Sequence, residues 1–240
     1  MYSCGENRET DSTKKEEVAE TKNENFETRA KRHAEVRLGI APTEKYQLAI
    51  HKEYLDGDNK TDAVILVNRL DFAKNEAAKS KNPVKQAELG FMGNYNYLFY
   101  YDGGLDKISP EIPIPSSPIA PLKVQFENIS SENYKDIIID YRVLNACFRN
   151  FYPVIEHTPR LVFQWKVFDG LNKPQKEAYC IQYDTGTLGI QKDILILKGR
   201  MKDPGKVDDI YHFDPEITPT SELLYRFFYY PKEGKYITKK

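Results

Sequence analysis

The chain has 240 residues, of which 35 are basic and 36 acidic, so its formal charge is −1. This balance gives no electrostatic argument for binding nucleic acid or an acidic membrane surface. A hydrophobic content of 40%, with 17 Tyr and 12 Phe, predicts a folded core built largely from strands, because aromatic rings pack well on a pleated surface. No run of 18 apolar residues occurs, so the sequence predicts no transmembrane helix.

The first 40 residues are predicted to form a disordered tether. Residues 5–25 are almost wholly polar, with charges of both signs. Such a segment buries too little apolar surface to offset the entropy lost on ordering. Residues 27–38 are expected to form a helical turn or two at most, because they show no apolar stripe.

Cys4 stands directly before this polar stretch, after Tyr2-Ser3 and before Gly5. This order resembles the mature start of a bacterial lipoprotein, of the kind common in Bacteroidota. The resemblance implies that Cys4 carries a lipid and that the membrane is a partner. It also implies a place on the outer membrane, facing the periplasm or the cell surface. The alternative is a cytoplasmic protein with an exposed Cys4.

An internal repeat organises the rest of the chain. Residues 48–65, "LAIHKEYLDGDNKTDAVI", align without gaps with residues 122–139, "LKVQFENISSENYKDIII". Each copy has an alternating strand, a polar turn, an Asp and an apolar strand, which predicts two paired strands. A fainter third copy, at residues 178–197, has Asp193 before its apolar strand.

The predicted fold is mostly β, with a β domain at residues 41–240. It contains three related units, at about 44–115, 120–175 and 178–240, each of three or four antiparallel strands. An incomplete propeller and a sandwich are the two arrangements left open. Residues 72–91 predict one short helical insertion, interrupted at Asn82-Pro83. Residues 109–122 hold five prolines and predict an extended connector between the first two units.

The acidic loop of the first copy, followed later by an aromatic strand ending in Asp102-Gly103, resembles FG-GAP or VCBS repeats. In that family the loop D-x-D-G-D-G-x-x-D precedes an apolar strand. The resemblance implies a calcium site that staples the fold. Tyr54 departs from the pattern at the first Asp. Asn59 stands where the pattern has Gly, and Asn tolerates the left-handed conformation that the turn needs. The implied ligands are Asp56, Asp58, the backbone carbonyl of Lys60, and Asp62.

The second copy offers a weaker set of calcium ligands. Its members are Asn128, Ser130, Glu132, the carbonyl of Tyr134, and Asp136. The alternative for both loops is that the acidic side chains cap turns by accepting hydrogen bonds from backbone N–H groups.

The remaining chemistry-bearing residues predict no active site. The four histidines have no metal-ligand spacing, and the sequence has no nucleophile elbow, P-loop or dinucleotide-binding turn. His212, among Asp208, Asp209 and Asp214, is either an acid–base cluster or part of a polar loop. Cys147 and Cys180 are either buried free thiols or, in an oxidising compartment, a disulfide.

The sequence therefore favours a non-enzymatic lipoprotein of the cell envelope, acting as an interaction or accessory subunit beside another envelope protein. Calcium is the only cofactor it suggests. The alternative is a carbohydrate-binding or carbohydrate-active module that uses an aromatic surface and carboxylates.

Overall fold

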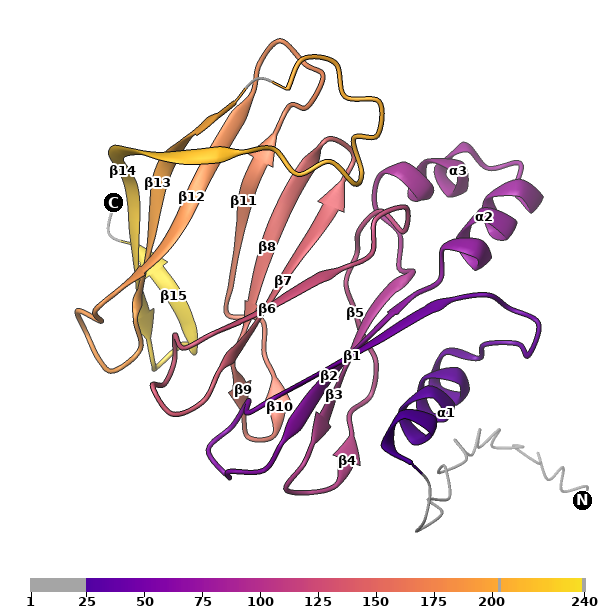
Figure 1. Cartoon of the computed structure of the whole chain (residues 1–240), viewed down its shortest axis with the longest axis horizontal. Coiled ribbons are helices and arrows are strands. Elements are labelled where there is room, and N and C mark those ends of the chain that lie inside the picture. The colour runs from indigo at the N-terminus through magenta and orange to yellow at the C-terminus, as the bar shows by residue number, and fades with distance from the viewer. Residues whose placement is uncertain (1–24, 203, 239–240) are drawn as a thin grey trace, which may run out of the picture.

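The computed structural model describes residues 25–202 and 204–238, which form mostly antiparallel β-structure (Figure 1). The first sheet holds β1 (Gln47–Glu53), β2 (Asp62–Asn68), β3 (Asn96–Asp102), β4 (Lys107–Ile108) and β5 (Ile112–Pro113). The second runs in the order β15 (Lys235–Thr238), β14 (Ile217–Tyr230), β13 (Asp193–Met201), β12 (Glu177–Asp184), β11 (Phe163–Asp169), β8 (Ala146–Tyr152), β7 (Asp136–Val143) and β6 (Lys123–Glu127). A small hairpin pairs β9 (Val154–Ile155) with β10 (Thr158–Pro159).

The two large sheets pack face to face around one hydrophobic core. Val64 and Leu66 of β2 meet Ile137 and Ile139 of β7 in this core. Alternate residues of each strand point to opposite faces, so Ile65 of β2 lies on the outer side of the first sheet. The arrangement found is therefore a sandwich. The second and third predicted units do not form separate blades but share one continuous sheet.

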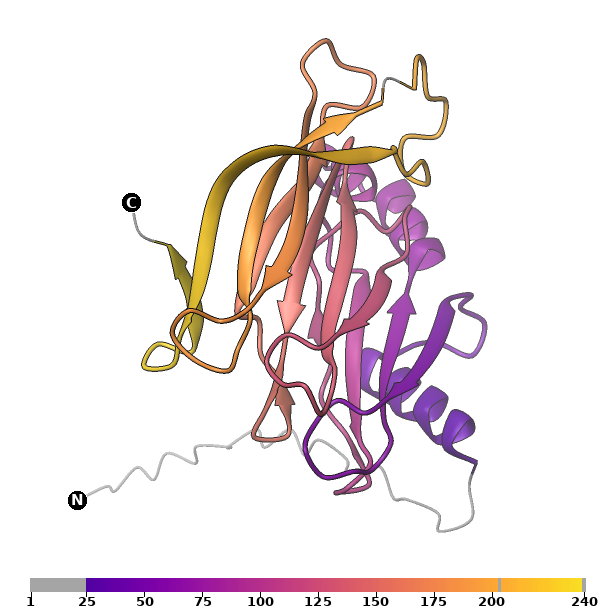
Figure 2. The same cartoon turned by 60° about the vertical axis from the view of Figure 1, so that its left-hand side comes forward.

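The second sheet rolls onto itself without closing into a barrel (Figure 2). The rings of Phe151 on β8 and Tyr236 on β15 lie 5.8 Å apart. Four strands separate β8 from β15 in the sheet, so in a flat sheet they would lie about 24 Å apart at the usual strand spacing. The rolled face encloses a second core that includes Ile138, Ile194 and Ile196.

The helix α1 (Phe26–Leu38) covers the outer face of the first sheet (Figure 1). It begins at an Asn25 cap and ends at Gly39, whose φ of 59° is left-handed. Ala30 and Ala34 are buried against the sheet. The prediction of a disordered tether is therefore wrong for residues 26–38. Two small alanines let the helix approach closely, and they give no wide apolar stripe in the sequence. Residues 1–24, with Cys4, lie outside the described residues.

The helical insertion consists of two helices, α2 (Leu70–Lys79) and α3 (Pro83–Gly90). The predicted break at Asn82-Pro83 is confirmed, because the Asn82 side chain caps α3 by accepting from the N–H of Val84 at 2.9 Å. Among the described residues, no helix is long and apolar enough to cross a membrane.

Part of the proline-rich connector is buried, although four of its five prolines are exposed. Ser116 and Ser117 are almost completely buried. The side chain of Asn96 donates to the Ser116 hydroxyl and the Ser117 carbonyl, and Asn68 donates to the carbonyl of Pro118 at 2.8 Å. Buried carbonyl groups need donors, and these asparagines supply them to Ser117 and Pro118.

Three hairpins of the two sheets share one design. They are β1–β2, β6–β7 and β12–β13, the segments that the sequence repeat marks. In each, an acidic pair closes the ladder and eight residues form the loop. The closing pairs are Glu53 with Asp62, Glu127 with Asp136, and Asp184 with Asp193.

The packing of α1 makes a prediction about stability. We expect Ala34→Glu to lower the free energy of unfolding by about 3 kcal/mol or more, because a carboxylate would be buried without a partner. Val36→Glu is the matched control, since Val36 lies on the exposed side of the same helix. We expect it to change stability by less than about 0.5 kcal/mol. Urea denaturation followed by circular dichroism measures both. Equal effects would contradict the packing.

Candidate cation site

A buried aspartate begins the second strand of each repeated hairpin. Asp62, Asp136 and Asp193 are all at most 1% exposed. Each accepts a hydrogen bond from a backbone N–H near the start of its own loop. The donors are Leu55 at 2.9 Å, Ile129 at 3.0 Å and Thr187 at 3.1 Å, respectively. These bonds lock the loop against the strand.

The three copies differ in how this buried negative charge is compensated. In the third copy, Arg226 forms an ion pair with Asp193 at 2.8 Å. In the second, both the N–H and the hydroxyl of Ser130 donate to Asp136. Burial nevertheless raises the pKa of Asp136 to about 6. In the first copy no lysine or arginine of residues 25–202 and 204–238 forms an ion pair with Asp62, which accepts instead from the N–H of Gly103 at 2.9 Å.

The first loop brings two further carboxylates to this position. One oxygen each of Asp56, Asp58 and Asp62 lies within 4.8 Å of the others. The loop is shaped by its own side chains, since the N–H of Asp58 donates to Asp56 and the N–H of Lys60 donates to Asp58. The structure thus gathers the three predicted carboxylates, while Lys60 lies exposed beside them.

The turn at the centre of the loop also has the expected backbone. Asn59 adopts a left-handed conformation with φ of 61°, as predicted for the position where the family pattern has Gly. The neighbouring turn after β3 approaches so closely that a Cβ at Gly104 would overlap the carboxylate of Asp58. Gly104 therefore allows the two loops to meet.

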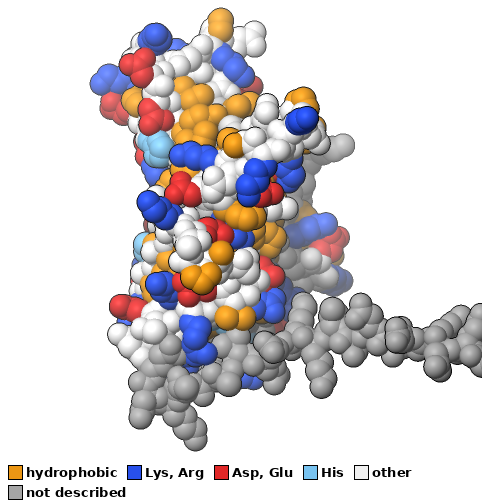
Figure 3. Space-filling model, turned by 90° about the vertical axis from the view of Figure 1, so that its right-hand side faces the viewer, with side chains coloured by type: hydrophobic (Ala, Val, Ile, Leu, Met, Phe, Trp, Pro, Cys, Tyr) orange, Lys and Arg blue, Asp and Glu red, His pale blue; other side chains and the backbone are white. Residues whose placement is uncertain are grey.

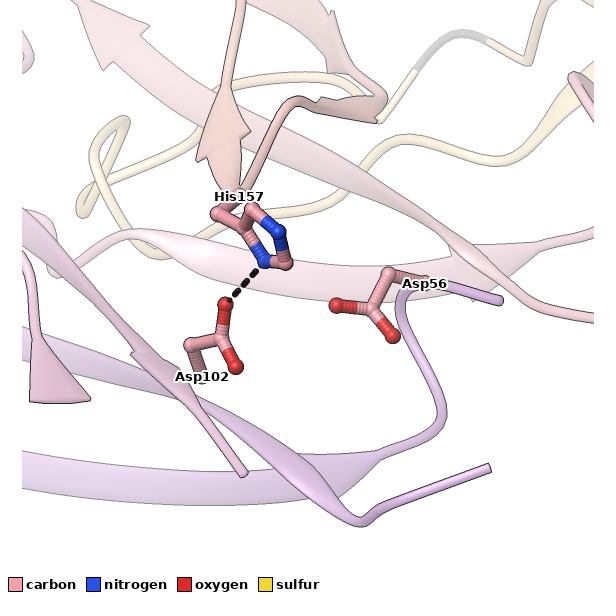
Figure 4. A group of neighbouring side chains, drawn as sticks. All are labelled: Asp56, Asp102 and His157. Atoms are coloured by element: carbon pink, nitrogen blue, oxygen red, sulfur yellow. Dashed lines mark hydrogen bonds and ion pairs between the residues drawn. The ribbon is translucent and has the colours of Figure 1, made fainter. Parts of the chain in front are cut away.

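Two residues that sequence reasoning missed form a second ligand group, which shares Asp56 with the first. Asp102, at the end of β3, is buried and lies 2.7 Å from Nδ1 of His157. His157 lies in the tight turn between β9 and β10, where it and Glu156 both have positive φ. Ligand atoms of Asp56, Asp102 and His157 also lie within 4.8 Å of one another (Figure 4). The only sequence signal near Asp102 is the following Gly-Gly turn, and His157 has none.

Burial and, after it, mutual repulsion act on the carboxylates of this group. Burial, then the neighbouring Asp58, raises the pKa of Asp56. Burial also raises the pKa of Asp62, and the charges of Asp56 and Asp58 add to the effect. Two carboxylates at such a distance repel by about 1 kcal/mol in water and about 3 kcal/mol at an effective dielectric constant near 20. A cation placed among them would remove this cost.

The donor set fits a hard divalent cation. Three carboxylates from one tight loop are typical calcium or magnesium ligands. The imidazole of His157 widens the choice to manganese or zinc. Because the groups come from the β1–β2 loop, the end of β3 and the β9–β10 hairpin, a bound ion would tie three segments together.

The second loop has the geometry of a turn. The side-chain amide of Asn128 donates to the carbonyls of Glu132 and Tyr134, and Ser130 donates to Asp136. These groups are the predicted ligands of the second site, and they already form hydrogen bonds with one another. The turn-capping alternative therefore has the greater geometric support here.

The other candidate residues do not join the site. Cys147 and Cys180 are free thiols, which corrects the disulfide alternative. Phe168 lies in register between Cys147 on β8 and Ala178 on β12, so the two cysteines are about two strand spacings apart and too distant to be bridged. His212 pairs with Asp209 at 2.8 Å in an exposed loop.

The raised pKa of Asp136 predicts how stability depends on pH. An aspartate in an unfolded chain titrates near about 3.9. The folded protein therefore binds this proton more tightly, so its free energy of unfolding rises as the pH falls from about 7 to about 4, and this gain is lost as the pH rises through 6. We expect the stability difference between the wild type and Asp136→Asn to change by about 2 kcal/mol over this range.

Urea denaturation at several pH values measures this difference. Asp208→Asn, in an exposed loop, is the control and should leave the pH profile unchanged. A wild-type profile parallel to that of Asp136→Asn would contradict the assignment.

Comparison of the chain with protein-family models, curated proteins and solved structures gives no match. The lipoprotein and FG-GAP resemblances therefore stay predictions.

Proposed function

We propose that this protein is a non-enzymatic interaction or accessory subunit of the bacterial cell envelope, whose β-sandwich is stapled by a divalent cation, calcium first among the candidates. The observation that carries the proposal is the group formed by Asp56, Asp58 and Asp62. These three carboxylates converge with no ion-pair partner among the described lysines and arginines. The third copy of the hairpin provides the comparison, because Arg226 neutralises the equivalent aspartate there.

The position of the site favours a structural role for the cation. Asp62 begins a core strand, and Asp102 ends the strand paired next to it. Tyr100, which is buried in the core between the sheets, donates its hydroxyl to Asp56 at 3.2 Å. His157 reaches the group from the hairpin that follows the second sheet's β8. A cation here would hold the edge of the sandwich where these parts meet.

Membrane attachment through Cys4 is the second part of the proposal. It rests on the sequence resemblance, since Cys4 lies outside the described residues. The lipid would place the domain at the outer membrane, facing the periplasm or the cell surface, where another envelope protein would bind it.

Carbohydrate binding is the second candidate function, and one surface feature favours it. Tyr225 of β14 is 46% exposed, and its ring centre lies 5.3 Å from that of Trp165 on β11. Phe227 lies beside both rings. Exposed aromatic faces of this kind stack on sugar rings as well as on protein surfaces.

The cation predicts a shift in melting temperature. At a calcium concentration of about 100 times Kd, binding to the folded state adds about 2.7 kcal/mol, which corresponds to a rise of roughly 5–10 °C for a domain of this size. We expect this rise relative to protein in a chelator, and we expect Asp58→Asn to abolish most of it. Asp208→Asn, an exposed change outside the group, should retain the full rise.

Differential scanning calorimetry with calcium, magnesium, manganese and zinc measures these shifts. The cation proposal would be contradicted if none of the four ions changed the melting temperature.

The lipid anchor predicts where the protein is found in the cell. In its own cells, we expect the full gene product to sediment with membranes and to incorporate labelled palmitate. Cys4→Ser should release it to the soluble fraction without label, because a thioether-linked lipid needs this sulfur. Cys180→Ser is the matched control and should behave like the wild type. Equal membrane fractions for the wild type and Cys4→Ser would contradict anchoring at this residue.

A further inference from the structure

A cavity of about 280 Å³ opens at one end of the rolled sheet, away from the acidic group. Its floor comes from β6, β7, β8 and β11, and the segment 211–217 covers it. The apolar wall includes Cys147, Val167, Phe168 and Ile217. Figure 3 shows hydrophobic side chains gathered near the top of the molecule, at the height of the loop between β13 and β14 in Figure 1, with charged side chains around them.

The cavity borders a buried arginine that forms no ion pair with any carboxylate of residues 25–202 and 204–238. Arg142 is 5% exposed and lines the cavity. Its two terminal nitrogens donate to the carbonyls of Ile210 and Phe213, while its Nε has no hydrogen-bond partner. No carboxylate in the described part of the chain lies within ion-pair distance of it. The guanidinium stacks on the ring of Phe168, 4.6 Å from the ring centre.

The charge of a second arginine on the same sheet, Arg149, is fully compensated. Arg149 makes two hydrogen bonds of 2.7 Å to the carboxylate of Asp140. A buried charge without such a partner is costly, and burial accordingly lowers the pKa of Arg142. Among the described residues that line the cavity, Lys123 and His212 pair with aspartates, and Arg142 has no ion-pair partner.

The other polar groups around the cavity do not form an ion pair with Arg142. The carboxylate of Asp140 is already neutralised by Arg149. Asp214 pairs with Lys123 at the exposed rim. Burial raises the pKa of the Cys147 thiol to about 12, so this wall stays uncharged at neutral pH. The cavity thus combines apolar walls with one arginine that forms no ion pair among the described residues and that Asp209 and Asp214 attract only through space.

We propose that this cavity binds a small monocarboxylate with an apolar body, such as a medium-chain fatty acid. The apolar chain lies against Val167, Phe168 and Ile217, and the carboxylate faces Arg142. The mouth of a rolled or closed β-sheet, lined by apolar side chains with a few polar groups, is a common place for such ligands. The volume admits a small molecule and is too small for a large lipid.

Isothermal titration calorimetry with octanoate and octan-1-ol tests the proposal on the full chain. These probes share the apolar chain and differ in charge. We expect octanoate to bind at least about tenfold more tightly, because its carboxylate carries the charge opposite to that of Arg142 and the octanol hydroxyl is neutral. Arg142→Met should remove this preference, because it weakens octanoate binding more than octanol binding.

A second variant keeps the test decisive if Arg142→Met unfolds the covering segment. Val167→Trp fills the cavity and should weaken both probes about tenfold or more, with an unchanged melting temperature. Ile190→Trp, at an exposed site elsewhere, is the matched control and should bind both probes like the wild type. The proposal is overturned if octanoate does not bind at millimolar concentration, if both probes bind the wild type equally, or if Val167→Trp binds octanoate unchanged.

Discussion

A carboxylate buried at the start of an inner strand is the constraint on which the repeated hairpins depend. Removing Asp62, Asp136 or Asp193 from water is costly unless donors are supplied. The nearest donors are the backbone N–H groups at the start of the same loop. Each loop must therefore fold back on its strand, and the same register and loop length follow in all three hairpins. Each copy of the internal repeat therefore supplies hydrogen bonds to its own buried aspartate in the same way.

The rest of the charge is compensated differently in each copy, and this difference produces the candidate site. Arg226 neutralises Asp193. Asp136 accepts a hydrogen bond from the hydroxyl of Ser130, and its pKa is raised. In the first copy, two further carboxylates, Asp56 and Asp58, lie where the other copies have a group that compensates the charge. The loop also lies where the first sheet meets the hairpin that carries His157. A cation bound there would complete in the first copy what Arg226 does in the third.

The rolling of the second sheet has a separate consequence. It brings the ring of Phe151 against that of Tyr236 and so builds a core from strands far apart in the sheet. At the end of the roll, the segment after β13 covers a cavity and takes the hydrogen bonds of Arg142. Arg149 shows that the same sheet can neutralise an arginine fully. The cavity therefore differs from the core around it in both shape and charge.

The sequence by itself determined the local features: the mostly β class, the hairpins of the repeat, the break at Asn82-Pro83, the left-handed Asn59 and the clustering of Asp56, Asp58 and Asp62. These features follow from residue periodicity and turn chemistry over short spans. Only the tertiary structure decided that α1 packs through two alanines, that residues 116–118 of the proline-rich connector are buried, and that His157 meets Asp102. It also fused two units into one rolled sheet around the cavity. These outcomes depend on contacts between residues distant in the chain, for which local patterns carry no signal.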